Sequence, residues 1–135
     1  MIFVDTNFFL RFLIKDEKRL YQEAKQFFLQ AEENKVILST NLIVIFEIYW
    51  VLKSFYRKKR RTVARILTDI LKLDFIYFPE RDLVKTALQL FVSTNLDLED
   101  CYHLVYAFDV QAEDLATFDR QLKKCFLKLK NGPKN

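Results

Sequence analysis

The residues of this chain that could do chemistry are almost all carboxylates. The sequence has 18 Asp and Glu residues but only one histidine, His103, and one glycine. It contains neither a G-x-x-x-x-G-K-[ST] phosphate loop nor a G-x-G-x-x-G turn, and it has no H-E-x-x-H zinc helix. A Ser or Cys nucleophile would depend on His103, and no nucleophile elbow is present. What remains is glycosidase-type acid–base chemistry or the binding of hard cations by oxygen ligands.

Two of the carboxylates follow segments with the pattern of short buried strands. Asp5 ends the apolar run MIFVD, and Asp119 follows residues 115–117, the fourth predicted strand. Ligands of open parallel sheets bind beyond the carboxyl ends of the strands, so we expect Asp5 and Asp119 at the same edge. The alternative for each residue is that it only caps the helix that follows it.

Two more carboxylates lie in predicted helices. Glu47 is the only charged residue in the segment 43–52, where burying an unpaired carboxylate would be costly. It could instead pair with Lys53 or Arg57, or point to solvent. Asp100 opens a helix together with Asp97 and Glu99, and acidic residues favour helix N-termini in any case. Helix capping is a sufficient explanation for Asp100 or Asp119 when each is considered alone. The four acids considered together indicate a functional site.

The elements that must position these carboxylates alternate between strands and helices. Strands are predicted at 1–5, 36–38, 74–78 and 115–117, with a possible edge strand at 126–127. Helices are predicted at 7–14, 17–34, 42–56, 62–71, 80–94, 98–111 and 119–124. This alternation predicts an α/β fold with a mostly parallel sheet, and the near absence of glycine disfavours a hairpin-rich all-β fold.

The strongest basic run is residues 57–61, flanked by Lys53 and Arg65. If a helix continued through this run, Arg57, Arg61 and Arg65 would share a face that could hold RNA phosphates. The commoner explanation of such a run is a solvated connection between helices. The net charge of +4 permits a polyanionic partner without requiring one.

Four segments, VDTNFFLRFL, FEIYWVLK, DLEDCYHLVYA and DLATFDRQLKK, occur in an order and spacing that resemble the PIN domain. Among PIN domains they are most similar to the VapC-like toxin ribonucleases of type II toxin–antitoxin pairs. The resemblance covers residues 1–129 as a single domain and leaves 130–135 as a polar tail that we expect to be disordered. It implies three α/β/α layers, with about seven helices around a short sheet of four or five strands.

Carried over to matching positions, the resemblance implies that the catalytic residues and ligands of Mg²⁺ or Mn²⁺ are Asp5, Glu47, Asp100 and Asp119. The supporting residues that it implies are Asn7, Thr117 and Asp97. The implied activity is endonucleolytic cleavage of RNA by a metal-activated water. The implied partners are a second copy of the chain and an antitoxin protein. Two alternatives stay open: a housekeeping RNA-processing nuclease without an antitoxin, and a catalytically inactive RNA- or protein-binding module.

Other features bear on compartment and partners. The chain shows no signal-peptide pattern and no apolar run long enough for a bilayer, and its two cysteines lack C-x-x-C spacing. We therefore expect a cytoplasmic protein with reduced thiols and no membrane contact. The apolar surplus at residues 8–14 suggests a protein partner, with packing on the next helix as the alternative. Tyr49 and Trp50 are expected in the core rather than as platforms for stacking bases.

Overall fold

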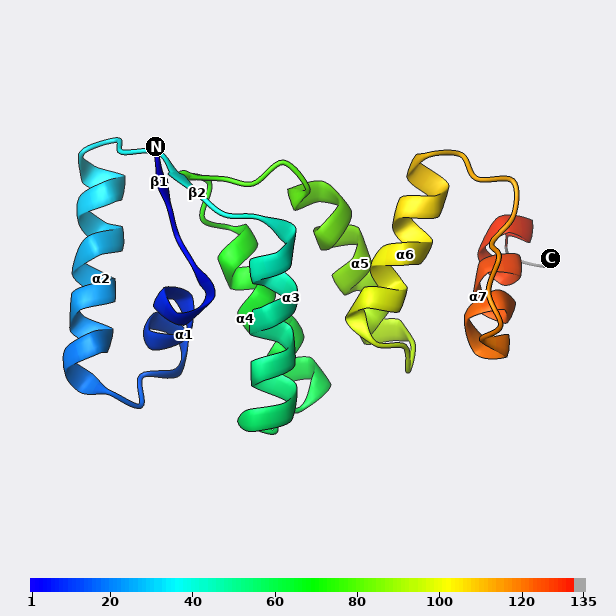
Figure 1. The fold of residues 1–135 in the computed structure, drawn as a ribbon, viewed down its shortest axis with the longest axis horizontal. Helices are drawn as coiled ribbons and strands as arrows, with labels where there is room; N and C mark the ends of the chain where they lie inside the picture. The colour runs from blue at the N-terminus through cyan, green and yellow to red at the C-terminus, as the bar shows by residue number, and fades with distance from the viewer. Residues whose placement is uncertain (133–135) are drawn as a thin grey trace.

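The computed structural model describes residues 1–132, and residues 133–135 of the predicted tail lie outside the described part (Figure 1). Within this range the chain forms seven α-helices, one π-helical segment and three short strands. In chain order they are β1 (Ile2–Phe3), α1 (Thr6–Ile14), α2 (Lys18–Glu33), β2 (Leu38–Ser39), α3 (Leu42–Trp50), η1 (Val51–Phe55), α4 (Arg60–Leu71), β3 (Ile76–Tyr77), α5 (Arg81–Ser93), α6 (Leu98–Asp109) and α7 (Arg120–Asn131).

The three strands form one parallel sheet in the order β1-β2-β3. Leu38 in the central strand is paired with Ile2 on one side and Ile76 on the other, and it is fully buried. The α/β class and the seven helices predicted from the sequence are confirmed for residues 1–132. The layering into α/β/α stays a prediction.

The sheet has three strands among the described residues, not the four or five predicted. Residues 126–127 lie in α7 instead of an edge strand, because Leu122 and Phe126 are one turn apart and both buried on one helix face. Phe126 stacks on Phe108 of α6 with ring centroids 5.1 Å apart. The segment 115–117 is extended but unpaired, and the carbonyl of Leu115 accepts a bond from Lys123 (2.8 Å).

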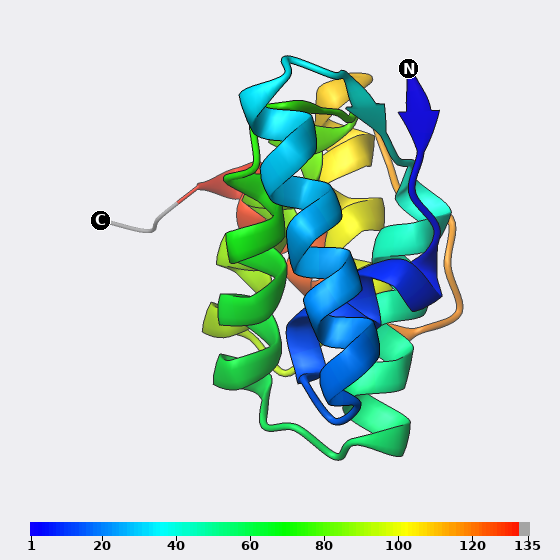
Figure 2. The same cartoon turned by 90° about the vertical axis from the view of Figure 1, so that its left-hand side faces the viewer.

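Helix α7 is also longer than predicted. It continues to Asn131, so residues 130–131 are helical and do not belong to a tail. Figure 1 shows α7 at the opposite end of the molecule from α1 and α2, with α3, α4, α5 and α6 between them. The side view in Figure 2 shows α1 and α2 in front of the other helices.

The apolar residues of α1 are absorbed by α2. Phe9 is fully buried, and the rings of Phe8 and Phe12 lie 4.9 Å from Phe27 and 5.0 Å from Phe28, respectively. Packing on the next helix therefore accounts for the apolar surplus of residues 8–14, and this surplus no longer indicates a protein partner.

The basic run does not form one helical face. The π-helical segment η1 closes with a bond from the Tyr56 amide to the Val51 carbonyl (3.1 Å), and Arg57 then adopts a left-handed backbone with φ 51°. Helix α4 begins only at Arg60. Arg61 and Arg65 lie on α4 and Arg57 does not, so the condition for a face shared by the three arginines is not met, and the run contains a connection between helices.

Two findings bear on the expected compartment. None of the helices within residues 1–132 combines the length and the apolar character needed to cross a bilayer. Cys101 is buried and Cys125 half-buried, and both are free thiols.

Candidate active site

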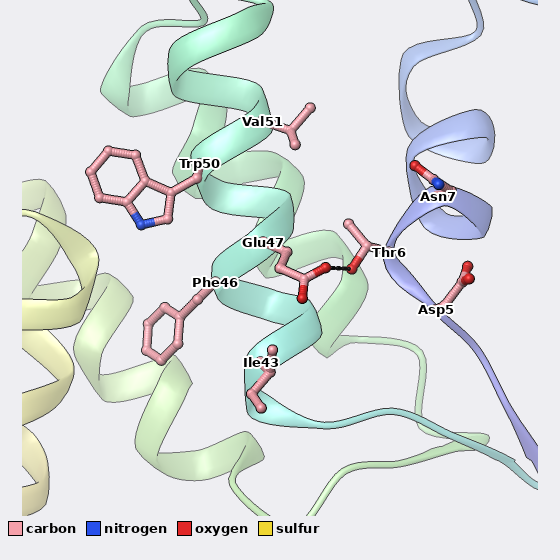
Figure 3. A pocket seen from close by; sticks show the side chains of 8 residues that line it. All are labelled: Asp5, Thr6, Asn7, Ile43, Phe46, Glu47, Trp50 and Val51. Carbon is pink, nitrogen blue, oxygen red and sulfur yellow. Dashed lines mark hydrogen bonds between the residues drawn. The ribbon is translucent and has the colours of Figure 1, made fainter.

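Asp5 and Glu47 line one pocket of about 540 Å³ between the start of α1 and helix α3 (Figure 3). Asp5 lies two residues after the end of β1, close to the strand end at which it was predicted. The lining consists of Asp5, Thr6, Asn7, Ile43, Phe46, Glu47, Trp50 and Val51. The two carboxylates are far apart in the sequence, and the packing of α1 against α3 brings them to the same cavity.

Thr6 joins the two sides of this pocket. Its hydroxyl donates a hydrogen bond of 2.6 Å to the Glu47 carboxylate, which fixes the orientation of that side chain (Figure 3). Sequence reasoning attached no role to Thr6, although it lies inside the VDTN segment. A hydroxyl next to an acidic strand end is too common to stand out as a signal.

Asp5 is a helix cap and a pocket residue at once. Its Oδ1 accepts a bond from the Phe8 amide (3.1 Å), which satisfies one of the free amides at the start of α1. The carboxylate retains its other oxygen, so the capping role and a role in the pocket are compatible.

Glu47 is exposed, so the cost of burying an unpaired carboxylate does not arise, and of the alternatives left open the exposed position is the one observed. Helix α3 turns Ile45 and Ile48 into the core, with both side chains fully buried, and presents Glu47 to the pocket. Among the ion pairs of residues 1–132, none joins Glu47 to Lys53 or Arg57.

Asp100 and Asp119 line a second pocket of about 550 Å³ together with His103 and Thr117. Burial raises the pKa of the Asp100 carboxyl, and the negative charge of Asp119 raises it further. His103 acts in the opposite direction, so this single histidine of the chain faces a carboxylate.

Asp119 caps α7 by accepting a bond from the Leu122 amide (3.0 Å). Its own amide donates to the Thr117 hydroxyl (3.0 Å), which fixes the turn before the helix. The supporting position expected at Thr117 therefore has a physical basis, namely the orientation of Asp119.

The four predicted carboxylates form two pairs in two separate pockets. In residues 1–132, no group of three or more His, Cys, Asp or Glu side chains is arranged so that it could hold a metal ion. The quartet therefore does not fit a single metal centre in this structure. Glu99 lines neither pocket, and its Oε1 is buried without a hydrogen-bond partner among the described residues.

Asp97 lies outside both pockets and ties α6 to the helix that carries Glu47. Its Oδ1 accepts bonds from Lys53 (2.6 Å) and from the Tyr49 hydroxyl (3.1 Å). The hydrogen bond from Lys53 is the main reason that the pKa of Asp97 lies below its ordinary value. Burial is the main reason that the pKa of the Tyr49 hydroxyl lies above the ordinary value of a tyrosine.

The arginines of the basic run have different environments. Arg57, Arg61 and Arg65 are exposed, so they are accessible to a polyanion. Arg60 instead turns inward, and its Nη2 donates to the carbonyls of Phe91 (2.6 Å), Leu96 (2.8 Å) and Thr94 (3.0 Å). Nothing in the run of basic letters distinguishes Arg60 from its neighbours.

The prediction of a core position is confirmed for Tyr49 and wrong for Trp50. Tyr49 is 1% exposed, whereas Trp50 is 43% exposed and lines the pocket of Asp5 and Glu47. Sequence reasoning missed this exposure because the apolar segment around Trp50 favours burial.

The comparisons with known proteins agree with the α/β architecture. The model of the PIN domain family matches residues 2–125, nearly the whole chain. This chain belongs to the PIN domain family. PIN domains are generally metal-dependent nucleases, and PIN nucleases act on RNA. Neither the curated proteins nor the solved structures gave a match.

Proposed function

We propose that this PIN domain is a metal-dependent endoribonuclease that hydrolyses phosphodiester bonds of RNA. The observation that carries the proposal is the convergence of Asp5 and Glu47 on one pocket, with Glu47 held by the Thr6 hydroxyl. Carboxylates that line a cavity would repel the phosphates of RNA, so a reaction there requires a cation to neutralise them. Mg²⁺ or Mn²⁺ would supply this charge and a more acidic water.

From the resemblance we assign catalytic and metal-binding roles to Asp5, Glu47, Asp100 and Asp119, which the structure divides between two pockets. Asp5 and Glu47 are supported by their shared pocket, and Asp100 and Asp119 by theirs. Thr117 supports Asp119 through its hydrogen bond. Asn7 supports the first pair from its position in the pocket lining.

The toxin of a toxin–antitoxin pair is the role that the sequence motifs favour, with a homodimer and an antitoxin as partners. This assignment rests on the four segments that resemble VapC-like ribonucleases. Induced expression of the wild-type chain in a bacterium should arrest growth, and expression of Asp5→Asn should not. Normal growth with an active wild-type enzyme would contradict the toxin role and leave the housekeeping nuclease as the explanation.

The nuclease activity is tested by incubating the purified chain with labelled single-stranded RNA in Mg²⁺, in Mn²⁺ and in EDTA. Cleavage is expected with either metal and not with EDTA. Asp5→Asn retains an N-cap side chain and Glu47→Gln retains an acceptor for Thr6, so both variants should fold and lose cleavage. Glu23→Gln, an exposed substitution on α2, is the matched control and should cleave like the wild type. Undiminished cleavage by Asp5→Asn would overturn the assignment.

A catalytically inactive RNA-binding module is the second candidate, and the separation of the two carboxylate pairs favours it. Such a protein would bind RNA without cutting it. The same incubation distinguishes the two candidates, because bound but intact RNA in every metal condition supports the module and excludes the nuclease.

A further inference from the structure

Helix α3 presents an aromatic surface next to the two carboxylates. In Figure 3, Phe46 and Trp50 project from one flank of α3, whereas Glu47 points from the other flank towards Thr6. Trp50 is 43% exposed and Ile43 is 66% exposed, and both line the pocket. A pocket that joins an exposed indole and an exposed aliphatic side chain to carboxylates differs from an ordinary polar surface.

The indole of Trp50 is held in place although it is exposed. The ring of Tyr49 meets it edge-on with centroids 5.4 Å apart, and the ammonium group of Lys53 lies 4.7 Å from the Trp50 ring centroid. Lys53 is itself fixed by Asp97. An aromatic ring whose orientation is already set loses little freedom when a ligand stacks on it.

The chemistry of this pocket matches that of a nucleotide. A nucleotide combines a flat, apolar base with an anionic phosphate, and unpaired bases of single-stranded RNA stack on aromatic side chains. Glu47 and Trp50 are three positions apart on α3 and line the same pocket, although they project from opposite flanks of the helix. RNA whose base stacks on the indole would therefore lie in the pocket that Asp5 and Glu47 also line.

We propose that Trp50 is the platform on which an unpaired base of single-stranded RNA stacks beside Asp5 and Glu47. This inference rests on the proposed ribonuclease function and narrows its substrate to RNA with accessible bases. The bases of a duplex stay stacked on one another and cannot reach the ring. A protein partner on the same surface would have to bury the carboxylates of the pocket, at a cost that RNA with a cation avoids.

The first experiment uses the emission of Trp50, the only tryptophan of the chain. Excitation at the red edge of the absorption band selects it over the six tyrosines. With the non-cleaving variant Asp5→Asn in Mg²⁺, short oligoadenylate should quench this emission in a saturable manner. The same strand annealed to oligouridylate should quench it much less. Equal quenching by the duplex, or no quenching by a strand whose binding is seen by fluorescence anisotropy, would overturn the proposal.

The second experiment compares variants by anisotropy of labelled oligoadenylate. Loss of one base–aromatic stack weakens binding by roughly 5- to 150-fold, the equivalent of about 1–3 kcal/mol. We expect this loss for Trp50→Ala and nearly full affinity for Trp50→Phe. Phe55→Ala is the matched control, because Phe55 is an aromatic residue with 76% exposure that does not line the pocket. Wild-type affinity of Trp50→Ala, or an equal loss for Phe55→Ala, would contradict the platform.

Failure of this inference can be told from failure of the proposed function. If the chain cleaves RNA and Trp50→Ala cleaves it with unchanged KM, the platform is wrong and the nuclease stands. If oligoadenylate quenches Trp50 and no metal supports cleavage, the platform stands and the nuclease is wrong. If the emission changes with protein concentration and not with RNA, the surface is an interface between copies, and the platform is wrong.

Discussion

Arg60 offers a direct test of how the basic run divides between structure and surface. Its Nη2 carries two hydrogens and faces three carbonyl oxygens, at 2.6, 2.8 and 3.0 Å, so two full hydrogen bonds are available. The guanidinium carbon also lies 3.7 Å from the ring centroid of Phe91, which is almost completely buried. These contacts fasten the start of α4 to the end of α5 and the loop after it.

The expected cost of Arg60→Ala follows from these contacts. Two charge-assisted hydrogen bonds at about 1.5 kcal/mol each, near the lower end of the range because the side chain is half-buried, contribute about 3 kcal/mol. Stacking of the guanidinium on Phe91 adds about 0.5–1 kcal/mol. A loss of about 3.5–4 kcal/mol is a large part of the free energy of unfolding of a domain, typically about 5–15 kcal/mol. With a urea m-value of about 2 kcal/mol/M, the unfolding midpoint should fall by roughly 2 M.

Urea unfolding followed by circular dichroism measures this change. Arg61→Ala, the exposed neighbour on the same helix, should shift the free energy of unfolding by less than about 0.5 kcal/mol. Arg60→Lys keeps the charge but cannot fork between carbonyls, so its midpoint should lie between those of the wild type and Arg60→Ala. If Arg60→Ala and Arg61→Ala unfold at the same urea concentration, the structural role of Arg60 is wrong.

Two further predictions concern the pH dependence of stability. The pKa of Asp100 is raised in the folded chain, so ionisation of this carboxyl lowers the stability of the fold as pH rises above the ordinary pKa of 3.8. Asp100→Asn should therefore melt at a higher temperature than the wild type near neutral pH. The difference between the two melting temperatures should disappear below about pH 4. An equal or lower melting temperature for Asp100→Asn near neutral pH would contradict a destabilising effect of the ionised Asp100 carboxylate. The pKa of Asp97 is lowered, so its contribution to stability is present above 3.8 and is lost as pH falls through the folded-state value. The urea midpoints of the wild type and Asp97→Asn should differ at about pH 6 and converge in acid, and identical midpoints at both pH values would show that the Lys53–Asp97 pair contributes nothing.

The helices were predictable from sequence because most of them have an apolar face of helical period, and three of the seven described α-helices begin at a residue whose side chain caps them. Asp5 and Asn41 cap α1 and α3 through the hydrogen bonds that residues of these types ordinarily make. The position of Asp5 after β1 was predicted from a short apolar run that ends in an acidic residue. These features depend on neighbours in the sequence, so they can be predicted without knowledge of the tertiary structure.

Features that depend on distant partners were not predictable in this way. Arg60 is structural because carbonyls at the end of α5 and in the following loop lie within reach, and no local pattern reports this. Trp50 lies in an apolar segment whose average favours burial, but α3 has one face on the pocket, and Trp50 is on that face. The strand predicted at 126–127 failed because a two-residue apolar run fits a strand and a helix equally well, and Leu122 decides for the helix.

The separation of the two carboxylate pairs follows from the strand that did not form. The prediction of one site required residues 115–117 to be a strand of the same parallel sheet as β1, because Asp119 would then lie at the carboxyl edge where Asp5 lies. In the structure β1 is an edge strand, with Ile2 45% and Phe3 55% exposed, and Phe118 projects fully into solvent. Asp119 instead stays with Asp100 on the side of α6 and α7. A centre with all four carboxylates therefore calls for a further parallel strand at residues 115–117, because such a strand would end at the same edge as β1 and bring Asp119 towards Asp5.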